Sequence, residues 1–306
     1  MISRLARAAL LFELLVYVAW GVWLHVGQVP LWRIFAMALA VALLLRLVVT
    51  LGPFLTVVVL RLRDGRNILG VGFGRAMLGE YVAKSLSFTL WQPFERRLMP
   101  PDPTPTPGGL TPILLVHGYL CNRGSWRVMR RLLGERLPNP VYTLSLEPPF
   151  ARIDDYVQQL ETRVATILAG SGHARMHLVC HSMGGLIARA WLARADGWSR
   201  VASLSMLGSP HHGTELARAG IGHNVRQMVK GNAWLTTLEA EEAGLVPRVP
   251  VISVHTENDN LVYPPESSDL SWAANIRIEG VGHVQLQSSV DVADHVVTNL
   301  RRVTLE

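Results

Sequence analysis

Ser182 is the residue in this sequence whose neighbours most favour chemistry. It lies in Cys180-His181-Ser182-Met183-Gly184-Gly185, between an apolar run and the helical pattern LIARAWLARA. A strand, a sharp turn with serine at its apex and a helix together form a nucleophile elbow, which needs small residues where strand and helix approach each other. Cys180 stands where the first small residue is usually glycine. The alternative interpretation is that Ser182 only caps the following helix.

A serine hydroxyl is a weak nucleophile until a histidine takes its proton and an acid orients that histidine. After such an elbow the acid follows along the chain and the histidine comes last. Asp259 lies in HTENDNLVYP and His283 in EGVGHVQL, each just after a predicted strand. Each alone fits an ordinary turn or loop residue, but jointly and in this order they predict a triad with Ser182. Glu257 and Asp269 are rival acids.

The developing oxyanion of such a reaction needs backbone donors. The apolar run 113–116 ends in His117-Gly118-Tyr119, where glycine lets the chain turn so that an N–H can point at the reacting group. We expect the oxyanion hole to comprise the N–H groups of Tyr119 and Met183. His117 is interpreted as a residue that braces this loop and not as a base.

Short apolar runs alternate with helical patterns in the last two thirds of the chain. Between the second and third runs, Asp154 or Asp155 can cap a helix with one apolar face that ends near Gly170. This alternation predicts an α/β fold with a mostly parallel sheet of about six strands and helices on both faces. The six runs are 113–116, 141–146, 176–180, 201–207, 251–255 and 275–279.

The first 66 residues contain two stretches long and apolar enough to cross a bilayer, 8–27 and 34–60. Gly52-Pro53 should kink the second stretch. A cleaved signal peptide is the alternative for the first stretch, but no small-x-small site follows it. The sequence therefore predicts a membrane hairpin, in which Glu13 and Arg46 form either a clasp or a functional pair.

The positive charge of the chain lies in its N-terminal third. Residues 1–99 carry 11 Lys and Arg against 4 Asp and Glu, whereas residues 100–306 carry 18 against 19. Arginines that flank apolar segments suit a membrane and not a nucleic-acid surface, so we expect no nucleic acid as a partner. By the positive-inside rule both ends of the hairpin face the cytoplasm, which predicts a multi-pass inner-membrane protein with a cytoplasmic catalytic domain. The deciding residues are Arg4, Arg7, Arg61, Arg63 and Arg66.

Three segments follow the hairpin. Residues 67–99 have the pattern of an amphipathic helix lying on the membrane surface or against the next domain. PPDPTPTPGG at 100–109 cannot form a helix and is interpreted as an extended tether. Residues 110–306 would form the catalytic domain.

No cofactor or metal is expected. Cys121 and Cys180 have no zinc-like or CxxC spacing and are interpreted as free thiols. The pair His211-His212 suggests a metal, but two adjacent histidines rarely point the same way. The sequence carries no signal of a particular oligomeric state.

Residues 110–306 resemble the α/β-hydrolase family and, within it, small bacterial lipases. The matching segments are LLVHGY, CHSMGG, LGSPHHGT, ENDNLVYP and GVGHVQLQSS. The resemblance implies the same triad and oxyanion hole, and it places SPHHGT beside the acyl site. Residues 214–249 then form either a lid over an acyl pocket or a helix that packs on the sheet.

The expected function is a membrane-tethered serine hydrolase that cleaves acyl or lipid esters through an acyl-enzyme. An acyltransferase or a thioesterase with the same triad is the first alternative, because the sequence does not separate these leaving groups and acceptors. A non-catalytic membrane scaffold that keeps the fold is the second alternative.

Overall fold

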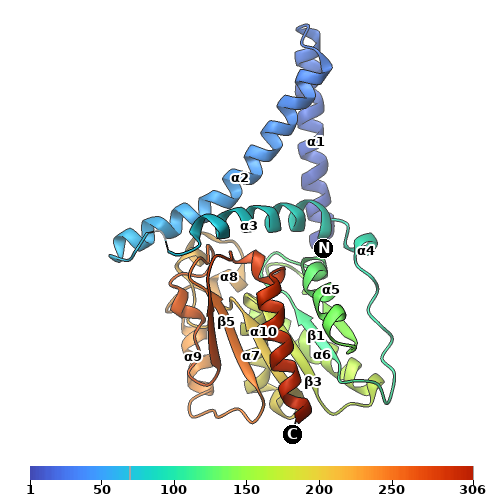
Figure 1. Ribbon diagram of the computed structural model, residues 1–306, viewed down its shortest axis with the longest axis vertical. Helices are drawn as coiled ribbons and strands as arrows, with labels where there is room; N and C mark the ends of the chain where they lie inside the picture. Colours follow the sequence, from blue (N-terminus) through green and yellow to red (C-terminus); the bar gives the residue numbers. More distant parts are fainter. Residues whose placement is uncertain (69, 306) are drawn as a thin grey trace.

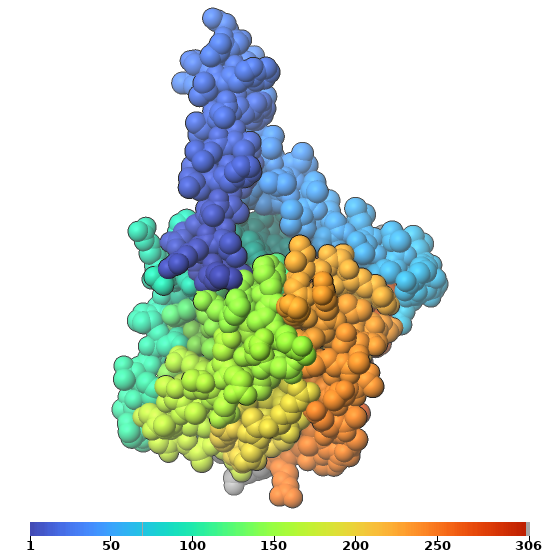
Figure 2. Space-filling view, turned by 180° about the vertical axis from the view of Figure 1, so that it is seen from behind, coloured from blue at the N-terminus to red at the C-terminus, as the bar shows by residue number. Residues whose placement is uncertain are grey.

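The computed structural model describes residues 1–68 and 70–305. Positions 69 and 306, which belong to the predicted segments 67–99 and 110–306, lie outside the described residues. A hairpin of two long helices projects from an α/β domain, and helix α3 lies across the end of the domain at the base of the hairpin (Figure 1). The view from behind shows the same projection standing clear of the domain surface (Figure 2).

The domain is built on a six-stranded sheet with the order β2-β1-β3-β4-β5-β6, and every neighbouring pair is parallel. This confirms the predicted α/β class. The chain reverses its direction of travel across the sheet between β1 and β3, and the carboxyl ends of strands at such a switch point are where ligands bind. The strands are β1 Ile113–Val116, β2 Val141–Leu144, β3 Met176–His181, β4 Val201–Leu207, β5 Val251–Thr256 and β6 Ala274–Ile278.

Helices cover both faces of the sheet because alternate residues of its buried strands point to opposite sides. Leu114 and Val116 pack into the layer of α6 and α7, whereas Ile113 and Leu115 pack into the layer of α5 and α10. The helices of these layers are α5 Arg127–Arg136, α6 Ile153–Ser171, α7 Met183–Arg194 and α10 Val290–Arg301.

The start of α6 differs from the prediction. Arg152 is its N-cap, and its backbone N–H donates to the Asp155 side chain at 2.9 Å, so Asp155 acts three positions inside the helix. The helix ends at Gly172, whose φ of 69° is the left-handed conformation that glycine adopts without strain. The predicted cap at Asp154 or Asp155 was therefore wrong, whereas the predicted end near Gly170 agrees with the last helical residue, Ser171.

The remaining short elements of the domain connect these layers. They are η2 Arg123–Trp126, η3 Gly197–Arg200, η4 Glu215–Ala219, α8 His223–Gln227, α9 Ala233–Glu241, η5 Pro265–Ser268, η6 Val284–Gln287 and η7 Arg302–Leu305.

Helices α1 Ile2–Val26 and α2 Leu31–Arg63 form the hairpin, and Pro53 lies inside α2. Arg46 clasps the two helices together, because its guanidinium donates to both oxygens of Glu13 at 2.6 and 2.9 Å. The most apolar 18-residue windows of the two helices are 0% and 6% buried. A core helix of a soluble protein would be mostly buried, so by length and composition these helices suit a bilayer.

The segment between hairpin and domain consists of α3 Phe73–Leu86, the π-helix η1 Ser87–Trp91 and the short α4 Glu95–Leu98. After it, residues 100–109 run along the side of the domain (Figure 1). Asp102 ties this extended stretch down, because it accepts from the backbone N–H of Thr143 at 2.9 Å and pairs with Arg123 and Arg130 at 3.3 Å.

Candidate active site

Ser182 occupies a strained turn between β3 and α7. Its φ of 54° and ψ of −126° are rare for a residue with a side chain, and such strain is kept where the surrounding structure enforces it. The enforcement comes from close packing behind the turn. A Cβ at Gly184 would lie 2.4 Å from the carbonyl oxygen of Val116, and one at Gly185 would lie 2.1 Å from Ser209 Oγ. The local geometry is that of a nucleophile elbow.

His283 and Asp259 meet beside this turn. His283 Nδ1 lies 2.8 Å from Asp259 Oδ2, and the two side chains are 3% and 2% exposed. The other carboxylate oxygen accepts from the backbone N–H groups of Leu261 and Val262 at 2.8 and 2.7 Å. Because Nδ1–H donates to the carboxylate, Nε2 is the nitrogen left to accept a proton.

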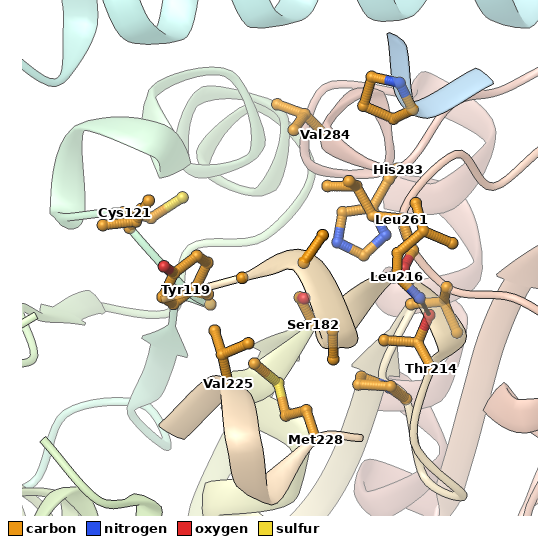
Figure 3. A pocket seen from close by; sticks show the side chains of 18 of the residues that line it. Tyr119, Cys121, Ser182, Thr214, Leu216, Val225, Met228, Leu261, His283 and Val284 are labelled. Atoms are coloured by element: carbon orange, nitrogen blue, oxygen red, sulfur yellow. Dashed lines mark hydrogen bonds between the residues drawn. The ribbon is translucent and has the colours of Figure 1, made fainter. Parts of the chain in front are cut away.

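Ser182 and His283 line one cavity, and their side chains face each other across it (Figure 3). Within the residues that the structure describes, no hydrogen bond joins the serine hydroxyl to the imidazole. Such bonds are often long without substrate and tighten when it binds.

The rival acids lie elsewhere. Glu257 pairs with Arg277 at 3.0 Å and with Arg61 at 3.8 Å. Asp269 lies 3.3 Å from the ring of His255. Asp259 is therefore the acid that the fold brings to the imidazole of the candidate base.

The predicted oxyanion donors lie on either side of Ser182. In the described part of the chain, the backbone N–H groups of Tyr119 and Met183 have no protein acceptor. A Cβ at Gly118 would lie 2.7 Å from the Cβ of Ser182 and 3.2 Å from its Oγ. Only glycine therefore lets the β1 loop come this close to the nucleophile.

Two buried histidines brace the site. His117 donates through Nδ1 to the Gly118 carbonyl at 2.9 Å and accepts from the Leu146 N–H at 3.1 Å, and burial lowers its pKa to about 4. His181 donates through Nε2 to the carbonyl of His283 at 3.0 Å, and burial together with the neighbouring imidazole holds its pKa well below the usual range. Both rings are thus neutral supports, as expected for His117.

The cavity has a volume of about 480 Å³ and a mostly apolar wall. This size is that of small-molecule sites, roughly 300–1,000 Å³. The hairpin and the segment after it contribute Pro53, Thr56, Lys84 and Phe88 to the wall, which the sequence reasoning missed. Those contacts join residues far apart in the chain, so no local pattern in the sequence signals them.

The two halves of residues 214–249 lie in different surroundings. The first half lines the cavity through Thr214, the turns of η4, Val225 and Met228 (Figure 3). The second half packs on the domain, since Leu235 and Leu238 of α9 are buried in the core next to α7.

The adjacent histidines of SPHHGT point to different partners. His211 is buried and contacts Ser253 Oγ at 3.2 Å, whereas His212 contacts the carboxylate of Glu239 at 2.7 Å. Among the described residues, no group of three or more His, Cys, Asp or Glu is arranged to hold a metal ion.

Both cysteines are buried and free. Burial raises the pKa of the Cys121 thiol to about 12 and also raises that of Cys180. Neither thiol is therefore an activated nucleophile at neutral pH.

Comparison with known proteins gives matches of sequence and of fold. Residues 112–244 match the palmitoyl protein thioesterase family. Lysosomal thioesterase PPT2 of Rattus norvegicus is 32% identical over 129 residues, which cover 40% of this chain and 41% of that protein. The human protein of the same name is 31% identical over the same shares. The chain thus spans about two fifths of the length of the curated relatives it matches.

Two solved lipases share the fold. The mature lipase BlEst2 of Bacillus licheniformis superposes with a TM-score of 0.56 and 18% identity, covering 66% of this chain and 95% of that one. Lipase B of Aspergillus fumigatus has a TM-score of 0.50 and 14% identity, covering 62% of this chain and 57% of that one. The chain therefore shares the fold of these lipases, with a parallel sheet and an elbow at its switch point, and residues 112–244 match the palmitoyl protein thioesterase family.

Proposed function

We propose that this protein is a membrane-tethered serine hydrolase that cleaves acyl esters of lipids through an acyl-enzyme. One observation carries the proposal: Ser182 stands on a strained elbow in an apolar cavity that is also lined by His283, whose ring is paired with the buried Asp259. A capping serine would need neither the strain nor an imidazole fixed by a carboxylate. The side chain of Ser182 also makes no capping hydrogen bond to α7.

The reaction follows from these positions. His283 Nε2 takes the proton of Ser182 as the oxygen attacks the acyl carbonyl, and Asp259 stabilises the imidazolium through Nδ1. The N–H groups of Tyr119 and Met183 hold the oxyanion of the tetrahedral intermediate. The imidazolium then protonates the leaving group, and water activated by the same ring releases the acid from the serine.

The surroundings of the cavity favour a membrane lipid as substrate. The hairpin and α3 supply part of the wall, so an acyl chain in the cavity would contact the same helices that meet the bilayer. On α3 and η1, Leu78, Val82, Leu86 and Leu90 are spaced by four residues and form an exposed apolar face. An apolar stripe that faces away from the protein suits the acyl boundary of a membrane.

We place the domain in the cytoplasm. The first residue of α1 and the last of α2 both lie at the domain, while the turn between the helices lies at the far end (Figure 1). The arginines at the domain end outnumber those at the far turn, where Arg33 lies. A reporter fused to the C-terminus should therefore be active in the cytoplasm, and activity only on the outer side would reverse the orientation.

A thioester is the second candidate for the scissile bond. The match of residues 112–244 to palmitoyl protein thioesterases favours it, whereas the triad and the cavity serve either leaving group. Paired substrates with one acyl chain and either an oxygen or a sulfur leaving atom separate the two, because only the leaving atom differs.

The experiment uses the full chain in lipid nanodiscs. Ser182→Ala should abolish hydrolysis of both paired substrates and labelling by a fluorophosphonate, with an unchanged melting curve. Ser171→Ala, at a buried serine in the last turn of α6 that does not line the cavity, is the matched control and should keep both activities. Hydrolysis that persists in pure Ser182→Ala protein would refute the proposal. Labelling without hydrolysis of any acyl substrate would favour another reaction of the same serine.

A further inference from the structure

We propose that residues 1–98, the N-terminal unit, position the active site as well as anchoring it. Three loops carry the candidate machinery: the oxyanion loop 117–124, the acid loop 257–263 and the base loop 279–287. Each of them is held by a different part of the N-terminal unit. The inference rests on the proposed function, since it concerns how fast the same serine reacts.

The base loop is fixed by α3. Glu80 is fully buried, and its Oε2 accepts from the backbone N–H of Gln285 at 2.9 Å. On the other side of His283, Arg75 donates to the carbonyl of Gly280 at 3.3 Å and to the preceding carbonyl at 2.8 Å. The two side chains of α3 thus grip the loop before and after the candidate base.

The packing at this contact is close as well as polar. A Cβ at Gly79 would lie 2.2 Å from the side chain of Gln285, and one at Gly72 would lie 2.7 Å from Gly280 Cα. Glycines on the N-terminal unit therefore let its backbone sit directly on the base loop.

The oxyanion loop is fixed by the residue after η1. Gln92 is fully buried, and its Oε1 accepts from the backbone N–H of Asn122 at 3.0 Å. The side chain of Asn122 in turn donates to the carbonyl of Gln92 at 3.0 Å and to Ser3 Oγ of α1 at 3.1 Å. Asn122 lies three positions after Tyr119, the candidate oxyanion donor.

The acid loop is fixed by the end of α2. The buried Arg61 donates to the carbonyl of Glu257, two residues before Asp259. At the other end of this loop, the Tyr263 hydroxyl donates to the carboxylate of Asp64 at 2.9 Å.

Loops at the edge of a sheet are otherwise free to shift, and a displacement of about 1 Å at a catalytic group can cost roughly a hundredfold in rate. If the contacts served only to dock the domain on the membrane, losing them would change stability or orientation. The rate of each correctly folded site would then stay the same. Measuring kcat per titrated site therefore distinguishes contacts that position the catalytic groups from contacts that only dock the domain.

The test uses the full chain in nanodiscs and a water-soluble, short-chain ester, so that delivery of substrate from the bilayer plays no part. Sites are counted by titration with a fluorophosphonate to its end point. Glu80→Ala and Gln92→Ala should each lower kcat per site about tenfold or more, with KM changed less than about twofold. Glu80→Gln keeps an oxygen that accepts from Gln285 and should restore most of the rate.

Tyr81→Phe is the matched control on the same helix. It removes a hydrogen bond to the Leu43 carbonyl of α2, which lies away from all three loops, and should leave kcat unchanged. If Glu80→Ala gives no titratable protein, Arg75→Ala, at the exposed edge of the same contact, replaces it in the test. A kcat per site below half of the wild-type value in Arg75→Ala would then support the proposal. Wild-type kcat per site in the Gln92 and Glu80 or Arg75 variants would overturn positioning, even though Ser182→Ala remained inactive.

Discussion

Replacing Asp259 by asparagine should inactivate the enzyme while preserving the fold. One oxygen of Asp259 accepts two backbone N–H groups, from Leu261 and Val262, and the other accepts one N–H from His283. An asparagine has one oxygen and one NH2 group at these two places. It keeps two hydrogen bonds by turning its oxygen to the backbone, so its NH2 group points at His283 Nδ1.

That orientation selects the wrong tautomer. His283 Nδ1 must then accept, which puts the proton on Nε2, and the ring can no longer take the proton of Ser182. The same change of the orienting acid in a serine protease lowers kcat about 10⁴-fold, which corresponds to roughly 5.5 kcal/mol at 1.36 kcal/mol per factor of ten. We expect a similar loss, because Asp259 is 2% exposed and water does not substitute for it.

The assay is ester hydrolysis per folded molecule in nanodiscs, with the melting curve as the measure of folding. Glu257→Gln and Asp269→Asn serve as controls, since these acids pair with Arg277 and His255 and not with His283. Both should change kcat less than about threefold. Asp259→Asn activity within tenfold of wild type would refute the tautomer argument. A large loss of kcat in Asp269→Asn would instead identify Asp269 as the acid of the triad.

Three further outcomes follow from the packing and the burial. Gly118→Ala should lower kcat about a hundredfold or more, because the new Cβ would lie 2.7 Å from the Cβ of Ser182. Gly134→Ala on α5 is the control: its new Cβ would enter open space, so kcat in the same assay should not change. Arg189→Ala should lower stability in denaturant titration by about 3–5 kcal/mol, because it leaves the buried carboxylate of Glu242 unpaired, and the double change Arg189→Met with Glu242→Leu should recover most of it. Folding lowers the pKa of His117 from 6.5 to about 4, so between these pH values the unfolded chain binds the proton and the folded chain does not. The contribution of this group to the free energy of unfolding should therefore be fully present above pH 6.5 and should fall toward pH 4 by about 1.4 kcal/mol per pH unit. Thermal melting over this pH range measures the loss.

The class of the fold was readable because its strands are buried on both faces. Runs such as ILLV at 113–116 and VASLSML at 201–207 are continuous and apolar, and both strands have the predicted bounds. Strands that are buried on both faces are typical of a parallel sheet covered by helices. The start of α6 was harder to predict, because aspartate is a good residue both at the N-cap and three positions inside the helix, where Asp155 lies.

The grouping of Ser182, Asp259 and His283 was predictable because each follows a strand of one parallel sheet, and all parallel strands end at the same edge. The choice of Asp259 over Glu257 could not be predicted in the same way. Both lie in one turn, and only the fold shows that Glu257 forms ion pairs with Arg277 and Arg61. The braces of the site, such as Gln92 on Asn122, connect residues 30 positions apart through single hydrogen bonds, which leave no period in the sequence.

Helix α3 shows why the sequence left two places open for residues 67–99, the membrane surface or the face of the next domain. In water the apolar stripe of a helix packs inward, so Leu78 and Val82 would mark its contact with the domain. In this protein Leu78 and Val82 are exposed instead, and the inward side carries Gly79, Glu80 and Ala83. A buried carboxylate on such a face is costly unless it has a partner, and Glu80 finds one in the backbone of the base loop. Under the proposed membrane attachment this inversion is expected, because one side of α3 would face the bilayer while the other holds polar loop backbone.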